Sequence, residues 1–170
     1  MIAGLTIRPE QPADRVAIYG VTKRAFATQP HADGDEQDLV DRLRERGELV
    51  LSLVAELPDA GVVGHIGFSP VTIDGADCGW FQLAPVSVEP AFHHRGIGSA
   101  LIETGVAELR ARGVRGIGVV GNPAYYERFG FAVIDGLGPD GPEAVYFRAM
   151  AFGGNPPAGV VRYASAFTAD

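Results

Sequence analysis

The sequence lacks several features that would assign it to common classes of protein. It has one cysteine, Cys78, so it can form neither an internal disulfide nor a multi-cysteine metal site. It has no apolar run long enough to span a membrane, and residues 1–10 lack the basic and apolar segments of a secretory signal. Basic residues are also few, because 14 lysines and arginines stand against 21 acids, which gives a net charge of −7. We therefore expect a cytoplasmic protein with neither nucleic acid nor membrane among its partners.

The composition is that of an ordinary folded protein. Hydrophobic residues make up 46% of the 170 positions and charged residues 21%. A chain of this size buries roughly 70% of the surface that its unfolded form exposes. There is no internal repeat and no long linker, so we predict a single domain over residues 1–170. Glycine is abundant, with 23 residues, and several of these lie in short apolar neighbourhoods.

Hydrophobic periodicity predicts an α+β fold. We expect extended segments at residues 2–8, 48–57, 62–73, 80–88, 114–120, 131–134, 143–151 and 159–163. We expect helices from residue 12 to about 26, from 39 to about 47, over 96–113 and over 122–128, with a loop at 136–142. Tight turns between the second, third and fourth strands predict an antiparallel meander. The strand–helix–strand unit at residues 81–120 makes the sheet locally parallel.

The most informative run is V-S-V-E-P-A-F-H-H-R-G-I-G at residues 86–98, where a strand leads through a turn into a long helix. The start of a helix has unpaired N–H groups and a partial positive charge, and Gly96 and Gly98 would let a phosphate approach the backbone. Arg95 adds a cation. A dinucleotide fingerprint would need glycine where Leu101 stands, and no Gly-Lys-Ser/Thr motif is present. The remaining interpretations are a pyrophosphate-binding loop and a tight turn that merely packs the helix.

Two motifs together resemble the GNAT superfamily of N-acetyltransferases. The first is V-S-V-E-P followed by His93-x-x-Gly96-x-Gly98, which is similar to the family's acyl-CoA loop. The second is N-P-A-Y-Y-E-R-F-G-F at residues 122–131, in the expected order along the chain. Residues 63–71, 84–86, 121–126 and 159–163 further resemble the YhbS-type subset of bacterial acetyltransferases. The resemblance implies a three-layer α/β arrangement, in which helices flank a mixed, mostly antiparallel central sheet with a V-shaped splay.

The resemblance also implies roles for individual residues. Tyr126 matches the tyrosine that protonates the departing thiolate in many members of the family, although a half-buried structural aromatic is the alternative. The cofactor contacts that it implies are Val86, Ser87, Val88, His93, His94, Arg95, Gly96, Ile97, Gly98, Ser99 and Asn122. The strand residues would bind acetyl-CoA through their backbone, and core packing of Val86 and Val88 is compatible with that. No metal is implied.

The activity implied is transfer of an acetyl group from acetyl-CoA to a primary amine by direct attack in a ternary complex. The acceptor would be a small molecule or a peptide, and a homodimer is left open. Two departures from the family matter: His93 stands at the usual Gln or Arg position, and residues 81–88 contain no carboxylate. The general base is therefore left open among Glu89, a histidine, an early-loop residue and water. The second departure also keeps open an acyl-CoA sensor without efficient catalysis.

Overall fold

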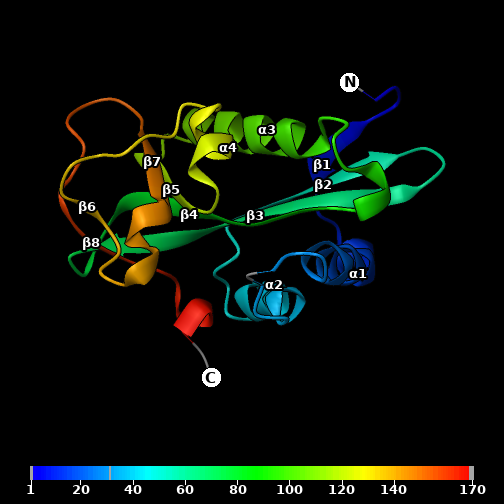
Figure 1. The fold of residues 1–170 in the computed structure, drawn as a ribbon, viewed down its shortest axis with the longest axis horizontal. Coiled ribbons are helices and arrows are strands. Elements are labelled where there is room, and N and C mark those ends of the chain that lie inside the picture. The colour runs from blue at the N-terminus through cyan, green and yellow to red at the C-terminus, as the bar shows by residue number, and fades with distance from the viewer. Residues whose placement is uncertain (1, 31, 169–170) are drawn as a thin grey trace. The chain divides into compact units, whose positions relative to one another are not determined.

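The computed structural model describes residues 2–30 and 32–168, whose ribbon is drawn in Figure 1. They divide into two compact units. The first unit runs to Phe68 and includes Ala84–Gly105. The second comprises Ser69–Leu83 and the chain from Val106 onward. The chain passes from one unit to the other within two strands and one helix. The single-domain organisation expected from the sequence stays a prediction.

The elements follow one another in a mixed order along the chain. The strands are β1 (Thr6–Pro9), β2 (Leu51–Leu57), β3 (Gly61–Ile73), β4 (Ala76–Val88), β5 (Gly116–Val120), β6 (Leu137–Gly138), β7 (Phe147–Ala151) and β8 (Gly159–Arg162). The helices are α1 (Arg15–Phe26), α2 (Glu36–Glu45), α3 (Ile97–Ala111) and α4 (Pro123–Glu127), with 3₁₀ segments at Pro12–Asp14, Pro90–Phe92, Pro142–Tyr146 and Ser165–Thr168. Among the described residues, none of the helices combines the length and the apolar character that crossing a membrane requires.

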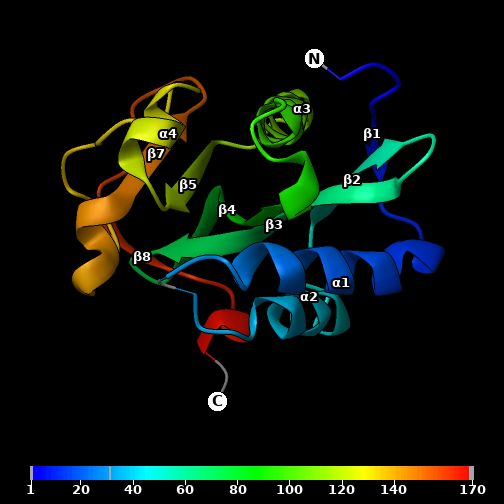
Figure 2. The ribbon, with the colours of Figure 1, turned by 45° about the vertical axis from the view of Figure 1, so that its right-hand side comes forward.

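In the first unit, α1 and α2 cover one face of the strands, and the first turns of α3 lie on the other (Figure 2). The strands follow the order β1-β2-β3-β4, and β2 pairs antiparallel with both β1 and β3. Ile18 of α1 and Val40 of α2 pack in one cluster with Val54 of β2. On the opposite face, Gly64 of β3 allows α3 to approach, because a Cβ there would lie 3.0 Å from Leu101.

In the second unit, β4 pairs in parallel with β5, and β5 pairs antiparallel with β7. β8 pairs with both β3 and β6. The buried core consists of Val71, Ile73, Trp80, Leu137, Phe147, Ala149 and Val161. Two glycines of β5 make room for the largest rings of this core. Gly116 faces Trp80, and a Cβ at Gly118 would lie 2.7 Å from Phe147.

The predicted α+β class and the mixed, mostly antiparallel sheet are confirmed. The sheet has the strand order β1-β2-β3-β4-β5-β7, with β8 joined to β3. The helix predicted at residues 96–113 is α3, and the parallel strand–helix–strand unit is β4-α3-β5. Pairing between β4 and β5 stops after Gln82 and Gly118. That early end is expected where two neighbouring strands splay apart.

Four predicted segments are wrong in whole or in part. Residues 131–134 form no strand, and Ala132 makes only an isolated bridge with Ala149. Residues 143–146 belong to a 3₁₀ segment that begins at Pro142, since proline favours the first position of a helical turn. The predicted 136–142 loop contains the short strand β6, and the first strand begins at Thr6 rather than at residue 2.

Candidate functional site

The turn between β4 and α3 presents an open helix start in the first unit. The backbone takes left-handed conformations at His94 (φ 62°) and Gly96 (φ 83°). The Gly96 carbonyl accepts the first helical hydrogen bond, from Ala100 N–H at 3.0 Å. A Cβ built on Gly96 would have no heavy atom within 4 Å, so this side of the turn is unobstructed. The N–H groups of residues 97–99 lie in the first helical turn, which has no intrahelical acceptors for them.

The side chains of this turn differ in their contacts and exposure. His93 Nε2 lies 2.8 Å from the carbonyl oxygen of Val88, so the ring braces the end of β4. His94 and Arg95 are exposed, and the Arg95 guanidinium lies 5.6 Å from the ring centre of Phe92. Of the three predicted side-chain contacts, His94 and Arg95 are accessible to an anion, whereas His93 is engaged by the backbone.

Side chains at the end of β4 alternate between buried and half-buried positions, as expected of a strand. Ser87 is buried, and its hydroxyl donates to Thr22 Oγ1 of α1 at 3.3 Å. Val86 and Val88 are half-buried. The structure therefore brings Val86, Ser87 and Val88 together with the turn in one unit. Whether their backbone contacts a ligand stays a prediction.

Glu89 follows directly and is held by an ion pair. Its two carboxylate oxygens accept from Arg24 of α1, at 2.7 Å from Nε and 2.9 Å from Nη2. Its N–H donates to the carbonyl of Val63 on β3 at 2.8 Å. Glu89 was one candidate for the general base, and here it would first have to leave Arg24.

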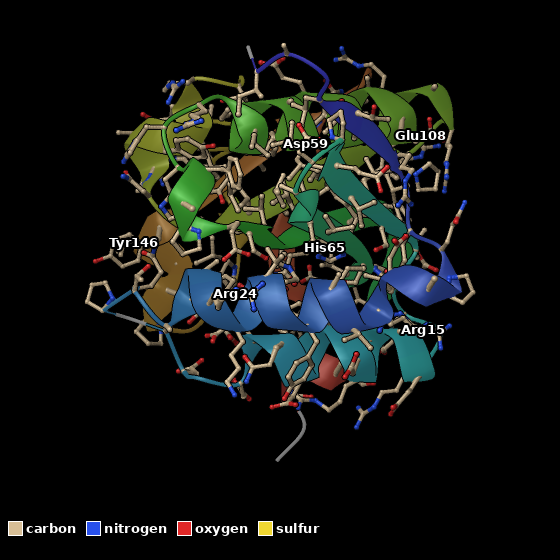
Figure 3. All side chains as sticks on the ribbon, turned by 90° about the vertical axis from the view of Figure 1, so that its right-hand side faces the viewer. Arg15, Arg24, Asp59, His65, Glu108 and Tyr146 are labelled. Carbon is tan, nitrogen blue, oxygen red and sulfur yellow. The ribbon has the colours of Figure 1, made fainter. Side chains whose placement is uncertain are left out.

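The histidine on β3, His65, is fully buried (Figure 3). Its Nε2 lies 2.8 Å from the hydroxyl of Ser52, and its Nδ1 has no partner among the described residues. Burial lowers its pKa to about 4, so the ring is neutral at pH 7. A buried ring with a lowered pKa is a weak base, which favours the structural interpretation of His65.

The second unit holds the other two predicted site residues on and beside α4. Asn122 caps this helix, and its Oδ1 accepts from Ala124 N–H at 3.1 Å. Tyr126 is 9% exposed and lies edge-on to the rings of Tyr125 and Phe131. Burial raises the pKa of Tyr126 above its ordinary value, so the phenol keeps its proton at neutral pH. The capping bond explains Asn122 without a ligand, whereas a protonated phenol is what an acid requires.

The strand expected to carry a base has one buried polar side chain besides Ser87. Gln82 is 6% exposed, and its Oε1 has no hydrogen-bond partner among the described residues. An amide oxygen can accept a hydrogen bond but cannot serve as a general base at neutral pH. Residues 81–88 of β4 therefore offer no side chain that could replace the missing carboxylate as a general base.

An acidic group lies outside the expected site, between α1 and α2. Carboxylate oxygens of Asp33, Asp35 and Glu36 lie within 4.8 Å of one another. Glu36 uses its oxygens to accept from the N–H groups of Asp33 and Gly34, at 2.8 and 3.1 Å. The group thus orders its own loop, and the expectation that no metal is bound stays a prediction.

Comparison with known proteins adds independent information. Residues 49–133 match the acetyltransferase (GNAT) domain family. A GNAT family acetyltransferase from Brucella melitensis, solved with acetyl-CoA, is 45% identical in sequence with a TM-score of 0.86, over 96% of this chain and 97% of that one. Escherichia coli YhbS, solved with CoA, is 31% identical with a TM-score of 0.89, over 99% and 94% of the two chains. In sequence alone, the N-acetyltransferase YhbS of Escherichia coli K12 is 35% identical over 127 residues, which cover 75% of this chain and 73% of YhbS.

Proposed function

The chain belongs to the GNAT family of acetyltransferases, and from that premise we propose that it transfers the acetyl group of acetyl-CoA to a primary amine. The observation that carries the proposal is the open helix start at Gly96, in a chain 45% identical to a protein crystallised with acetyl-CoA. A phosphate fits such a place because unpaired N–H groups and the helix dipole both favour an anion.

The proposed cofactor contacts divide by chemistry. The backbone N–H groups of residues 94–99 bind the pyrophosphate, and Arg95 adds charge from the exposed side of the turn. The backbone of Val86, Ser87 and Val88 pairs with the pantetheine arm. This division is supported by the burial of Ser87, whose side chain is already bonded to Thr22. His93 contributes by bracing Val88, and Asn122 contributes by capping α4.

The proposed chemistry is direct transfer in a ternary complex. The neutral amine attacks the thioester carbon, a C–N bond forms, and backbone N–H groups of the strand stabilise the oxyanion. The C–S bond then breaks, and the phenol of Tyr126 gives its proton to the thiolate. The ammonium proton of the acceptor passes to a base that we leave unassigned. No covalent enzyme intermediate is required.

Two measurements test this function. Calorimetric titration with CoA measures binding, and a thiol-release assay with acetyl-CoA and a broad panel of small and peptide amines measures transfer. We expect CoA to bind and at least one amine to release thiol above the rate of hydrolysis. Tight CoA binding with no acceptor in the panel would favour the acyl-CoA sensor instead. Absence of CoA binding would contradict both functions.

A further inference from the structure

Arg24 of α1 reaches Glu89 because of the residue one helical turn before it. Long helical side chains point back toward the N-terminus, so the Arg24 side chain covers position 20. That position is glycine, and a Cβ there would lie 2.9 Å from Nη1 of Arg24. The absence of a side chain at Gly20 leaves the space that the guanidinium occupies.

The guanidinium meets its partner in a two-pronged arrangement. Nε and Nη2 donate to the two carboxylate oxygens of Glu89, at 2.7 and 2.9 Å. The Arg24 side chain is 58% exposed and that of Glu89 20% exposed, so one partner is largely withdrawn from water. Such paired, parallel hydrogen bonds fix orientation as well as distance.

Glu89 directly follows Val88, the last residue of β4, and begins the turn. Its N–H is bonded to Val63, and its carbonyl accepts from Phe92 N–H at 2.8 Å. The side chain therefore adds a third restraint, from α1, to a backbone already tied on both sides. Two residues earlier, Ser87 is tied to the same helix through Thr22. Side chains of α1 are thus hydrogen-bonded to Ser87, near the end of β4, and to Glu89, directly after it.

We propose that α1 positions the pyrophosphate-binding turn through the ion pair between Arg24 and Glu89, with Gly20 providing the room for it. The inference rests on the proposed function, because it concerns the turn assigned there to CoA. In this role Arg24 and Glu89 are positioning residues, which act through the backbone of the turn. The turn needs left-handed backbone at His94 and Gly96, which is a minor conformation for a free loop residue such as histidine. Fixing Glu89 restricts the other conformations that the turn could adopt, so less conformational entropy is lost when CoA binds.

The test is a double-mutant cycle on CoA binding, which requires no knowledge of the acceptor. Arg24→Ala is expected to raise the Kd of CoA about fivefold, at the upper end of what an exposed pair contributes. In the Glu89→Ala background the same change should have much less effect, since the partner is already gone. A matched control is Arg162→Ala, which removes the exposed ion pair with Asp140 in the second unit and should leave the Kd unchanged.

Gly20→Ala tests the position of the Arg24 side chain without changing any charge and without lowering stability. It keeps every charge, and alanine is more favourable than glycine in a helix interior. We expect it to raise the Kd of CoA by about twofold without lowering the melting temperature, and to have no effect in the Arg24→Ala background.

Three results would decide against the inference. The first is an unchanged Kd of CoA in Arg24→Ala, and the second is an equal effect of Arg24→Ala with and without Glu89. The third is a lowered melting temperature of Gly20→Ala together with normal CoA binding. Each leaves the proposed function intact, because wild-type protein would still bind CoA. Failure of wild-type protein to bind CoA would instead contradict the proposed function and remove the ground for the inference.

Discussion

The hydroxyl of Ser52 lies 2.8 Å from Nε2 of His65, and the direction of this hydrogen bond follows from a third residue. Ser52 donates its only proton to Glu10, whose Oε1 lies 2.5 Å away. The hydroxyl oxygen must therefore accept from His65, which assigns the proton of the neutral ring to Nε2. Arg44 completes the chain by donating to both oxygens of Glu10, at 2.7 and 2.9 Å.

This arrangement predicts that stability falls in mild acid. His65 has a pKa of about 4 in the folded protein and about 6.5 in the unfolded chain, so between these values only the unfolded chain binds the proton. Stability is then fully present above pH 6.5 and is lost as the pH falls toward 4. The linkage amounts to about 2 kcal/mol between pH 7 and 5. Urea unfolding at the two pH values measures it.

The control is His65→Gln, which removes the titrating ring. Its free energy of unfolding should change much less between pH 7 and 5, even if the variant is less stable at both. The pKa of Glu10 is raised by burial but lowered further by the bonds from Arg44 and Ser52, with a net decrease. Its contribution is therefore lost only below its ordinary pKa of about 4.5, outside this window. An equal pH dependence in wild type and variant would contradict the assignment to His65.

Tyr126→Phe should separate catalysis from binding. The variant keeps the ring that packs against Tyr125 and Phe131 and loses only the phenolic proton. With an active amine, we expect kcat to fall about 100-fold, which is the typical contribution of a positioned acid. The Kd of CoA and the melting temperature should stay near the wild-type values.

The pH profile gives a second check on Tyr126. Burial raises the pKa of its phenol above the ordinary value of 10, so the acid stays protonated in alkaline solution. We expect kcat of wild type to show no decline as the pH rises toward 10. A kcat for Tyr126→Phe within threefold of wild type would show that another group protonates the thiolate.

Local sequence patterns predicted those parts of the fold that depend on neighbours in the chain. The stripe of Leu101, Ile102 and Leu109 placed α3 within one or two residues of its ends, because the helical period is a local property. The pairing of Thr72 with Arg162 joins residues far apart in the chain. No local period specifies such a pair, so the place of β8 beside β3 was beyond sequence analysis.

The same distinction applies to the site. Gly96 and Gly98 revealed the turn because a strand, a turn and a helix follow one another directly. Arg24 and Glu89 are separated by 65 positions, and nothing in either neighbourhood indicates that they meet. A glycine inside a helical pattern, Gly20, was the one available signal, since it invites the question of which side chain fills the space.

Two glycines inside helices provide a contrast in stability. A Cβ at Gly105 of α3 would lie 2.5 Å from the ring of Phe68, which is fully buried, whereas Gly20 faces only the end of the long, largely exposed side chain of Arg24. Gly105→Ala should therefore destabilise the protein by about 1–2 kcal/mol, because overpacking outweighs the gain in helix propensity. Gly20→Ala serves as the control and should not destabilise it. Urea unfolding of both variants compares the two directly, and equal free energies would contradict the close packing of Gly105 on Phe68.

Gly96→Ala tests the turn itself. Gly96 has φ of 83°, a conformation that costs a side-chain-bearing residue about 1–2 kcal/mol, although its Cβ would meet no atom within 4 Å. The matched variant is Gly47→Ala, after α2, with φ of 69° and equally open surroundings. Both variants should lose similar stability in urea, since the strain is alike. Only Gly96→Ala should weaken CoA binding, by about tenfold, because the strain there is relieved by leaving the conformation that presents the N–H groups of α3. If the two variants bound CoA equally well, the turn at Gly96 would not be the phosphate site, whatever their stabilities.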